Sequence, residues 1–247
     1  MNKNAHGIQA MLIDETGRKF WDRYFYFFMS LLIVVVIAFG FSQTIDMNLI
    51  HPTIPRPFLL YVHAAVFTGW LAFFILQSAL VRTSNVRIHR AIGTFGIAMG
   101  VGIPVLGVAT ALTMTRFDIE QLHNPTAATD MIIPLFDMVA FTSTFILAIF
   151  WRKKPELHRR LILVATCALT AAGFGRFPAW ILPPSIFYAG VDLLILLGVA
   201  RDLIVNRKVH AVYAYVLPAF IVGQTVALYA ALHRPALWVS IAHMILS

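Results

Sequence analysis

Long apolar segments separated by short polar ones dominate the chain, and seven of them are long enough to cross a lipid bilayer. A hydrocarbon core about 30 Å thick requires roughly 20 helical residues. The predicted spans are residues 24–45, 57–82, 88–115, 131–151, 157–176, 186–206 and 210–232. The fifth and sixth have the least sharply defined ends, because prolines interrupt the link between them. The pattern predicts an all-α, polytopic membrane bundle of seven transmembrane helices.

The same pattern divides the chain into three parts. Residues 1–23 form a cytoplasmic N-terminal segment, residues 24–232 the transmembrane domain, and residues 233–247 a short interfacial tail that cannot span. After the first helix, the domain reads as three helical hairpins. The first helix of each hairpin carries one ionisable residue near its outer end, and the second begins with a histidine after a basic loop. We therefore predict one lone helix plus three hairpins.

Composition supports this assignment. The 247 residues are 60% hydrophobic and only 12% charged, with a mean hydropathy of +0.79, whereas a soluble domain has about 25% charged residues. The net charge of +8 would suggest nucleic acid in a soluble protein. Here the basic residues lie between apolar spans, so no nucleic-acid partner is expected. The single cysteine, Cys167, excludes an intramolecular disulfide and a cysteine-based zinc or iron–sulfur site.

The distribution of Lys and Arg predicts the orientation. With the N-terminus in the cytoplasm, the opposite side holds only four of them, namely Arg56, Arg116, Arg176 and Arg234. The other fifteen fall in cytoplasmic segments, which is the bias that bilayer insertion favours. The C-terminus is then on the opposite side.

Three ionisable residues, His63, Asp137 and Asp192, lie at similar depth inside three different spans, and we call them the outer layer. A charge at bilayer depth costs roughly 2.5–3.5 kcal/mol on insertion scales. Three interpretations are open: an incomplete ligand shell for a metal such as Zn or Fe, a proton relay or cation site, or a buried network that fixes helix packing. The supporting residues predicted to reach this layer or its helix face are Arg176, Gln224 and Gln77.

A second polar layer, the inner ring, opens three of the helices at the cytoplasmic side. Its predicted members are His89, Arg90, His158, Arg159, His210 and Asp202. Helix N-termini favour anions, so the ring could recognise a phosphate, a carboxylate or a lipid head group. Two histidines at equal depth could also ligate haem b, and Asp202 could accept a hydrogen bond from a histidine. Alternatively, these charges only set the topology at the head-group level.

Glycines follow His89 along one face of the helix predicted at 88–115, with Gly93, Gly96, Gly100 and Gly107 in register. A glycine face allows a flat macrocycle to lie against the backbone. It equally allows close packing of another helix, as small-residue faces do in membranes.

The absence of particular residues excludes several classes of membrane protein. The seventh span lacks a lysine for a retinal Schiff base, and no His-Glu-x-x-His sequence marks a helical zinc protease. A two-haem transmembrane cytochrome needs four histidines at two depths, and the outer level offers only His63 within a span. At most one inner haem is compatible with the chain.

The runs Tyr61-Val-His63-Ala-Ala-Val-Phe67-Thr68-Gly69-Trp70 and Arg87-Ile-His89-Arg90-Ala-Ile-Gly93 carry a family resemblance. Together with Gln77 they resemble the His…Phe-Thr-x-Trp…Gln…His-Arg-x-x-Gly pattern of uncharacterised bacterial seven-helix inner-membrane proteins. The resemblance covers most of residues 24–230 and implies a bacterial inner-membrane location. It implies no activity.

The leading functional hypothesis is a metal- or haem-binding membrane protein with a redox or transport role. In it, the outer layer supplies ligands or proton carriers, and the inner ring a second site or anion port. One alternative is a membrane-embedded, metal-dependent enzyme acting on a lipid or small amphiphile. The other is a non-catalytic subunit or assembly factor of a membrane complex, in which the polar layers only hold helices together.

Overall fold

A computed structural model of the protein describes the backbone of residues 3–247 and the side chains from residue 20 onward. Within that range the chain contains helices and no β-strand, which confirms the all-α prediction. The helices are α1 (Lys3–Ser42), η1 (Asp46–Ile50), α2 (Phe58–Arg82), α3 (Val86–Glu120), α4 (Ala127–Asp130), α5 (Ile132–Phe150), α6 (Pro155–Ala168), α7 (Ala171–Phe174), η2 (Pro184–Ile186), α8 (Tyr188–Asn206), α9 (Ala211–His233) and α10 (Ala236–Leu246).

Six helical segments of the described chain are long and apolar enough to cross a membrane. They are Phe20–Ser42 within α1, α2, α3, Ala127–Phe150 across α4 and α5, Pro155–Phe174 across α6 and α7, and α9. Six of the seven predicted spans therefore have a counterpart. The remaining one corresponds to α8, which has 19 residues but includes Asp192, Arg201 and Asp202, too many charges for a span identified by composition.

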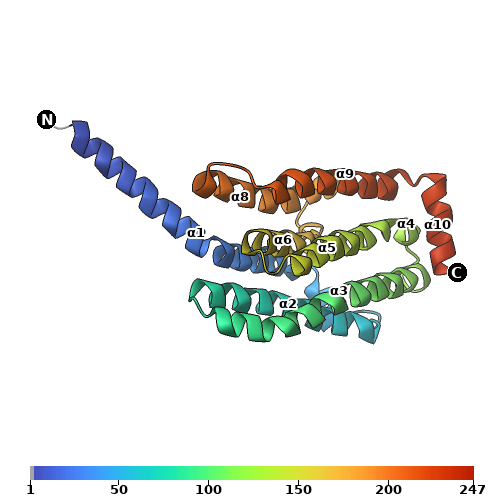
Figure 1. The fold of residues 1–247 in the computed structure, drawn as a ribbon. Helices are drawn as coiled ribbons and strands as arrows, with labels where there is room; N and C mark the ends of the chain where they lie inside the picture. Colours follow the sequence, from blue (N-terminus) through green and yellow to red (C-terminus); the bar gives the residue numbers. More distant parts are fainter. Residues whose placement is uncertain (1–2) are drawn as a thin grey trace.

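The long helices run alternately up and down the bundle, and the N-terminal part of α1 projects beyond it (Figure 1). The turns α2–α3, α5–α6 and α8–α9 lie at the same end, which we call the basic end, and the links from α3 to α4 and from α9 to α10 lie at the far end. Each predicted hairpin forms a contacting pair: α2 with α3, α5 with α6, and α8 with α9. The basic residues of these three turns therefore lie at one end of the bundle.

The C-terminal helix α10 lies across the far end (Figure 1). It is fixed there by Trp238, whose indole Nε1 donates to the carbonyl of Thr129 at 2.9 Å, and by the fully buried Ala242. At 11 residues it is too short to span, as predicted for the tail.

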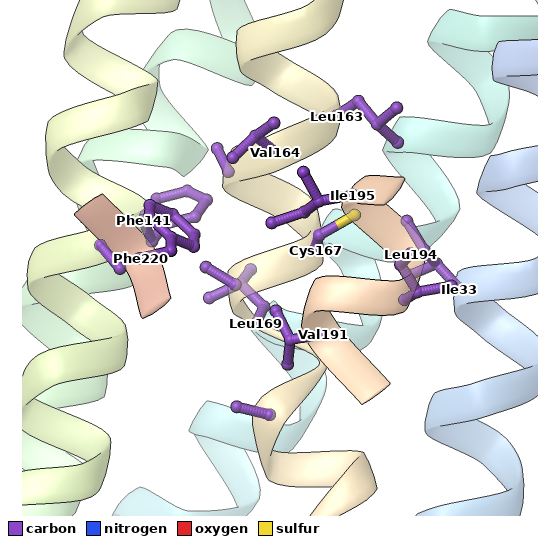
Figure 2. Packing of buried hydrophobic residues seen from close by; sticks show 14 of the residues in the cluster. Ile33, Phe141, Leu163, Val164, Cys167, Leu169, Val191, Leu194, Ile195 and Phe220 are labelled. Carbon is purple, nitrogen blue, oxygen red and sulfur yellow. The ribbon is translucent and has the colours of Figure 1, made fainter. Parts of the chain in front are cut away.

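The core of the bundle is centred on α6. Leu163, Val164 and Cys167 of this helix are fully buried. Figure 2 shows Cys167 among Val164, Leu194 and Ile195, with α8 packed alongside α6. Because α6 is enclosed by other helices, its polar residues must find partners within the protein.

Glycines allow the helices to approach closely. A methyl group added at Gly40 of α1 would lie only 2.2 Å from the carbonyl oxygen of Gly173 in α7, so the two backbones touch. The predicted glycine face of α3 is occupied by side chains, with Phe73 against Gly96, Phe145 against Gly100 and Met138 against Gly107. The helix-packing interpretation of this face is confirmed at these three glycines, and side chains take the space that a macrocycle would need.

Candidate functional site

The inner ring contains an ion pair that sequence reasoning did not identify. Arg160 of α6 and Asp202 of α8 are both completely buried. The Arg160 guanidinium donates from Nε to Oδ2 of Asp202 at 2.8 Å and from Nη2 to Oδ1 at 2.6 Å. This is the bidentate geometry in which arginine and carboxylate bind most strongly. Arg160 is one of the basic residues predicted at the cytoplasmic start of the helix at 157–176, where no partner was predicted for it.

Four more charged residues extend this pair into what we call the inner ion network, made of Asp22, Glu156, Arg159, Arg160, Arg201 and Asp202. Arg201 donates to Asp202 at 2.7 Å and also contacts Asp22 of α1. Glu156 accepts from Arg159 and Arg160, each at 2.7 Å. Three arginines face three carboxylates, so the network is electrically neutral and joins α1, α6 and α8.

The predicted partnership of Asp202 with a histidine is therefore corrected. Asp202 accepts from Arg160, Arg201 and Asn206, the last at 3.1 Å. Of the predicted ring, Arg159 and Asp202 belong to the ion network, whereas the exposed Arg90 has no contact with it among the described residues.

The histidines of the ring have local roles. His158 is hydrogen-bonded through Nδ1 to the carbonyl of Ala148 at 2.9 Å, which ties α6 to α5. By contrast, Nδ1 of His89 is buried without a hydrogen-bond partner among the described residues. His210 caps α9, because its Nδ1 accepts from the backbone N–H of Val212 at 3.2 Å. Burial, and then the positive charge of Arg160, lower the pKa of His210 below its usual 6.5.

In the outer layer, Asp137 of α5 is buried, and it accepts a hydrogen bond from the hydroxyl of Tyr188 at 2.8 Å. Tyr188 begins α8 and is itself buried, so the bond joins α5 to α8 inside the bundle. The sequence prediction missed Tyr188. Its position at the outer end of the sixth predicted span was the only available indication.

His63 of α2 stacks on Phe67 of the same helix, with ring centroids 3.9 Å apart, and its Nδ1 is buried without a hydrogen-bond partner. Arg176, which was predicted to reach the level of this layer, is near enough for its charge to act on His63. The Arg176 guanidinium lies 4.3 Å from the ring of Phe41 and donates to the carbonyl of Ala172. His63 is thus held by an aromatic stack beside a cation.

Asp192 of α8 lies within hydrogen-bonding reach of Gln224 of α9, the side chain predicted to share its level. Gln224 is buried, and Oδ1 of Asp192 is buried without a partner. Gln77, the third supporting residue, lies instead toward the basic end of α2, near His89, and has both amide atoms buried and unpaired. The outer layer therefore retains polar atoms with unused hydrogen-bonding capacity.

The described residues contain no group of three or more His, Cys, Asp or Glu side chains close enough together to hold a metal ion. His63, Asp137 and Asp192 are consequently not assembled into the predicted shell. Asp137 has a tyrosine as its hydrogen-bond partner, and Asp192 has an amide within reach.

A groove of about 540 Å³ opens at the far end, where residues 54–57 meet the last turns of α3. Its polar lining includes Arg116, Glu120 and Gln121, and none of the outer-layer residues reaches it. Comparison with known proteins shows no family model, no curated protein and no solved structure that matches this chain.

Proposed function

We propose that the chain is a seven-span protein of the bacterial inner membrane, with α8 as the seventh span and the N-terminus in the cytoplasm. A helix of 19 residues is roughly 28 Å long, which suits a hydrocarbon core of about 30 Å. Its charges need not face lipid, because Arg201 and Asp202 are paired in the inner ion network and Asp192 lies beside Gln224. Pairing of this kind is how intramembrane charges are tolerated.

We further propose that the outer layer carries protons as part of a redox or transport role. The observation that supports this is that two ionisable side chains of the outer layer have buried atoms without a hydrogen-bond partner, namely Nδ1 of His63 and Oδ1 of Asp192. Neither side chain forms an ion pair with a described residue, whereas every carboxylate of the inner ion network is paired with arginine. Unpaired ionisable groups inside a membrane are costly, and they mark proton and ion pathways in pumps and transporters.

The chemistry of the layer suits proton transfer. An imidazole and a carboxyl group each bind and release a proton, and a phenol both donates and accepts. The hydroxyl of Tyr188 is already bonded to Asp137, so a proton that reaches Asp137 has a neighbour able to exchange it. Asp192 is a second carboxyl group in this layer, and the Gln224 amide near it can orient that carboxyl group but cannot itself carry a proton. The proposal needs no metal.

A second function is favoured by a different observation, namely that the polar contacts converge on α8. Through Tyr188, Arg201 and Asp202 this helix is bonded to α5, α1 and α6, and Asp192 reaches toward α9. Such contacts would hold together the helices of a non-catalytic subunit or assembly factor. In that case the outer layer contributes to stability alone.

Proton flux into liposomes separates the two functions. The purified chain is reconstituted with an internal pH dye, and a potassium gradient with valinomycin drives the flux. The proton-carrying function predicts flux above empty liposomes that falls at least tenfold in Asp137→Asn. Glu120→Gln, an exposed carboxylate at the far end, is the control and should leave the flux unchanged.

Absence of flux, or flux that Asp137→Asn leaves intact, contradicts the proton-carrying function. The packing function then predicts a lower melting temperature for both Asp137→Asn and Tyr188→Phe. A visible spectrum and elemental analysis of the same preparation test whether the redox role uses haem or a metal ion. A Soret band would indicate bound haem, and stoichiometric zinc or iron would indicate a metal site.

A further inference from the structure

Some arginines at the basic end remain without carboxylate partners. The described acidic side chains at this end are Asp22, Glu156 and Asp202, and all three are engaged by Arg159, Arg160 and Arg201. Arg23 of α1 and Arg82 of α2 have no carboxylate partner among the described side chains. The basic end thus divides into a neutral interior and a positively charged surface where α1 and α2 meet.

Aromatic rings of α1 hold these two cations in place. The Arg82 guanidinium lies 4.8 Å from the ring of Tyr24 and 4.9 Å from that of Phe27, and the Arg23 guanidinium lies 5.7 Å from Tyr24. Cation–π contacts fix the position of a guanidinium but leave its N–H donors free for an anion. We call Arg23, Tyr24, Phe27 and Arg82 the α1–α2 patch.

An exposed apolar face adjoins the α1–α2 patch. Tyr24 stacks between Phe20 and Phe28, with ring centroids 4.7 and 6.2 Å away, and both phenylalanines are exposed. The same face of α1 continues through the exposed Leu31 and Val35 into the predicted span. Cations beside aromatic rings, followed by an apolar helix face, are arranged as at the head-group level of a bilayer.

We propose that the α1–α2 patch binds the head group of an anionic phospholipid, with Arg82 and Arg23 contacting the phosphate. The group that the patch recognises is a phosphate ester. The apolar face below the patch favours a lipid over a free phosphate, because acyl chains can lie along Phe28, Leu31 and Val35. A free anion would leave that face unused. This site is independent of the proton-carrying function, since it shares no residue with the outer layer.

Lipid binding to the purified full chain in dodecyl maltoside tests the site. Phosphatidylglycerol, phosphatidylcholine and inorganic phosphate are titrated separately, with melting temperature and native mass spectrometry as readouts. Phosphatidylglycerol should raise the melting temperature and remain bound, and the other two should not. Arg82→Gln and Arg23→Gln should each weaken its binding roughly fivefold, the change expected from one surface cation, and Arg82→Lys should retain most of it.

Arg152→Gln is the matched control, because Arg152 is exposed at the same end on the α5–α6 turn and its loss changes the net charge equally. If Arg152→Gln weakened phosphatidylglycerol binding as much as Arg82→Gln does, the proposal would be overturned in favour of a diffuse attraction between charges. Equal stabilisation by inorganic phosphate would overturn it in favour of a free-anion site. Arg23 is exposed, so Arg23→Gln tests the site even if Arg82→Gln fails to fold.

Discussion

Arg160 and Asp202 form a bidentate ion pair although neither side chain is accessible to solvent and 42 residues separate them in the chain. Two such groups are stable in the interior only because each neutralises the other and fills its hydrogen-bonding capacity. The pair holds the enclosed helix α6 against α8, which carries Asp192, Arg201 and Asp202. Together with the polar contacts Tyr188–Asp137 and Arg201–Asp22, it fixes the position of α8 in the bundle.

Loss of one member of this pair should be strongly destabilising. Asp202→Asn removes the one fully buried carboxylate of the network and leaves Arg160 and Arg201 only the partly exposed Glu156 and Asp22, so we expect a loss of about 3–5 kcal/mol in unfolding free energy. Glu156→Gln is the control, because the Glu156 side chain is 58% exposed and should lose about 1 kcal/mol or less. Denaturation by sodium dodecyl sulfate in mixed micelles measures both, and equal losses would contradict the prediction.

Glycine substitutions in α3 should differ by position. A methyl group at Gly100 would lie 2.1 Å from Phe145, so Gly100→Ala should cost about 1–3 kcal/mol by forcing α3 away from α5. Gly93→Ala meets nothing within 4 Å and should be neutral or stabilise the helix by up to about 1 kcal/mol. Melting temperatures of the two variants check this. A similar change in both would argue against glycine-dependent packing.

Stability should depend on the protonation of His210. Burial lowers its folded pKa below the usual 6.5, so the neutral form is favoured in the folded state. The contribution of neutral His210 to the free energy of unfolding is fully present above pH 6.5. It is lost as the pH falls through the folded pKa, because the unfolded chain takes up the proton first. Protonation of Nδ1 also removes the acceptor that caps α9.

The matched variant for this prediction is His210→Asn, which keeps a good cap and cannot titrate. The melting temperature of wild type relative to His210→Asn, measured between pH 8 and pH 5, should fall on acidification. A constant difference over that range would exclude His210 as the titrating group. His210→Ala should lose about 0.5–2 kcal/mol at neutral pH and less on acidification, because protonation of Nδ1 already removes the cap in the wild type.

The seven-span topology can be tested by cysteine labelling. If α8 crosses the membrane, Ser185 before it and Lys208 after it lie on opposite sides, and both are exposed. In a Cys167→Ala background, an impermeant maleimide should label Ser185→Cys in intact cells. It should label Lys208→Cys only after permeabilisation. Labelling of both from one side would show that α8 does not span.

The sequence predicted how deep the residues of the candidate site lie within their helices, but not which side chains they contact. Asp137 and Asp192 stand out in a sequence because a carboxylate inside an apolar span is costly, whatever surrounds it. Their neighbours Tyr188 and Gln224 are ordinary residues for a membrane helix, and only the rotation and pairing of α5, α8 and α9 bring them within reach. The expected metal shell was an inference from depth alone, and equal depth does not place side chains face to face.

The amino-acid sequence by itself determined the helical class, six of the spans and the segregation of basic residues to one end, because these follow from transfer of each segment between water and lipid. Only the tertiary structure decided which charges are paired. In lipid, apolar side chains do not distinguish the face of a helix that packs from the face that meets acyl chains. Contacts such as Arg160–Asp202, Asp137–Tyr188 and Gly40–Gly173 therefore depend on how the helices are rotated and which become neighbours, and that is a property of the folded bundle.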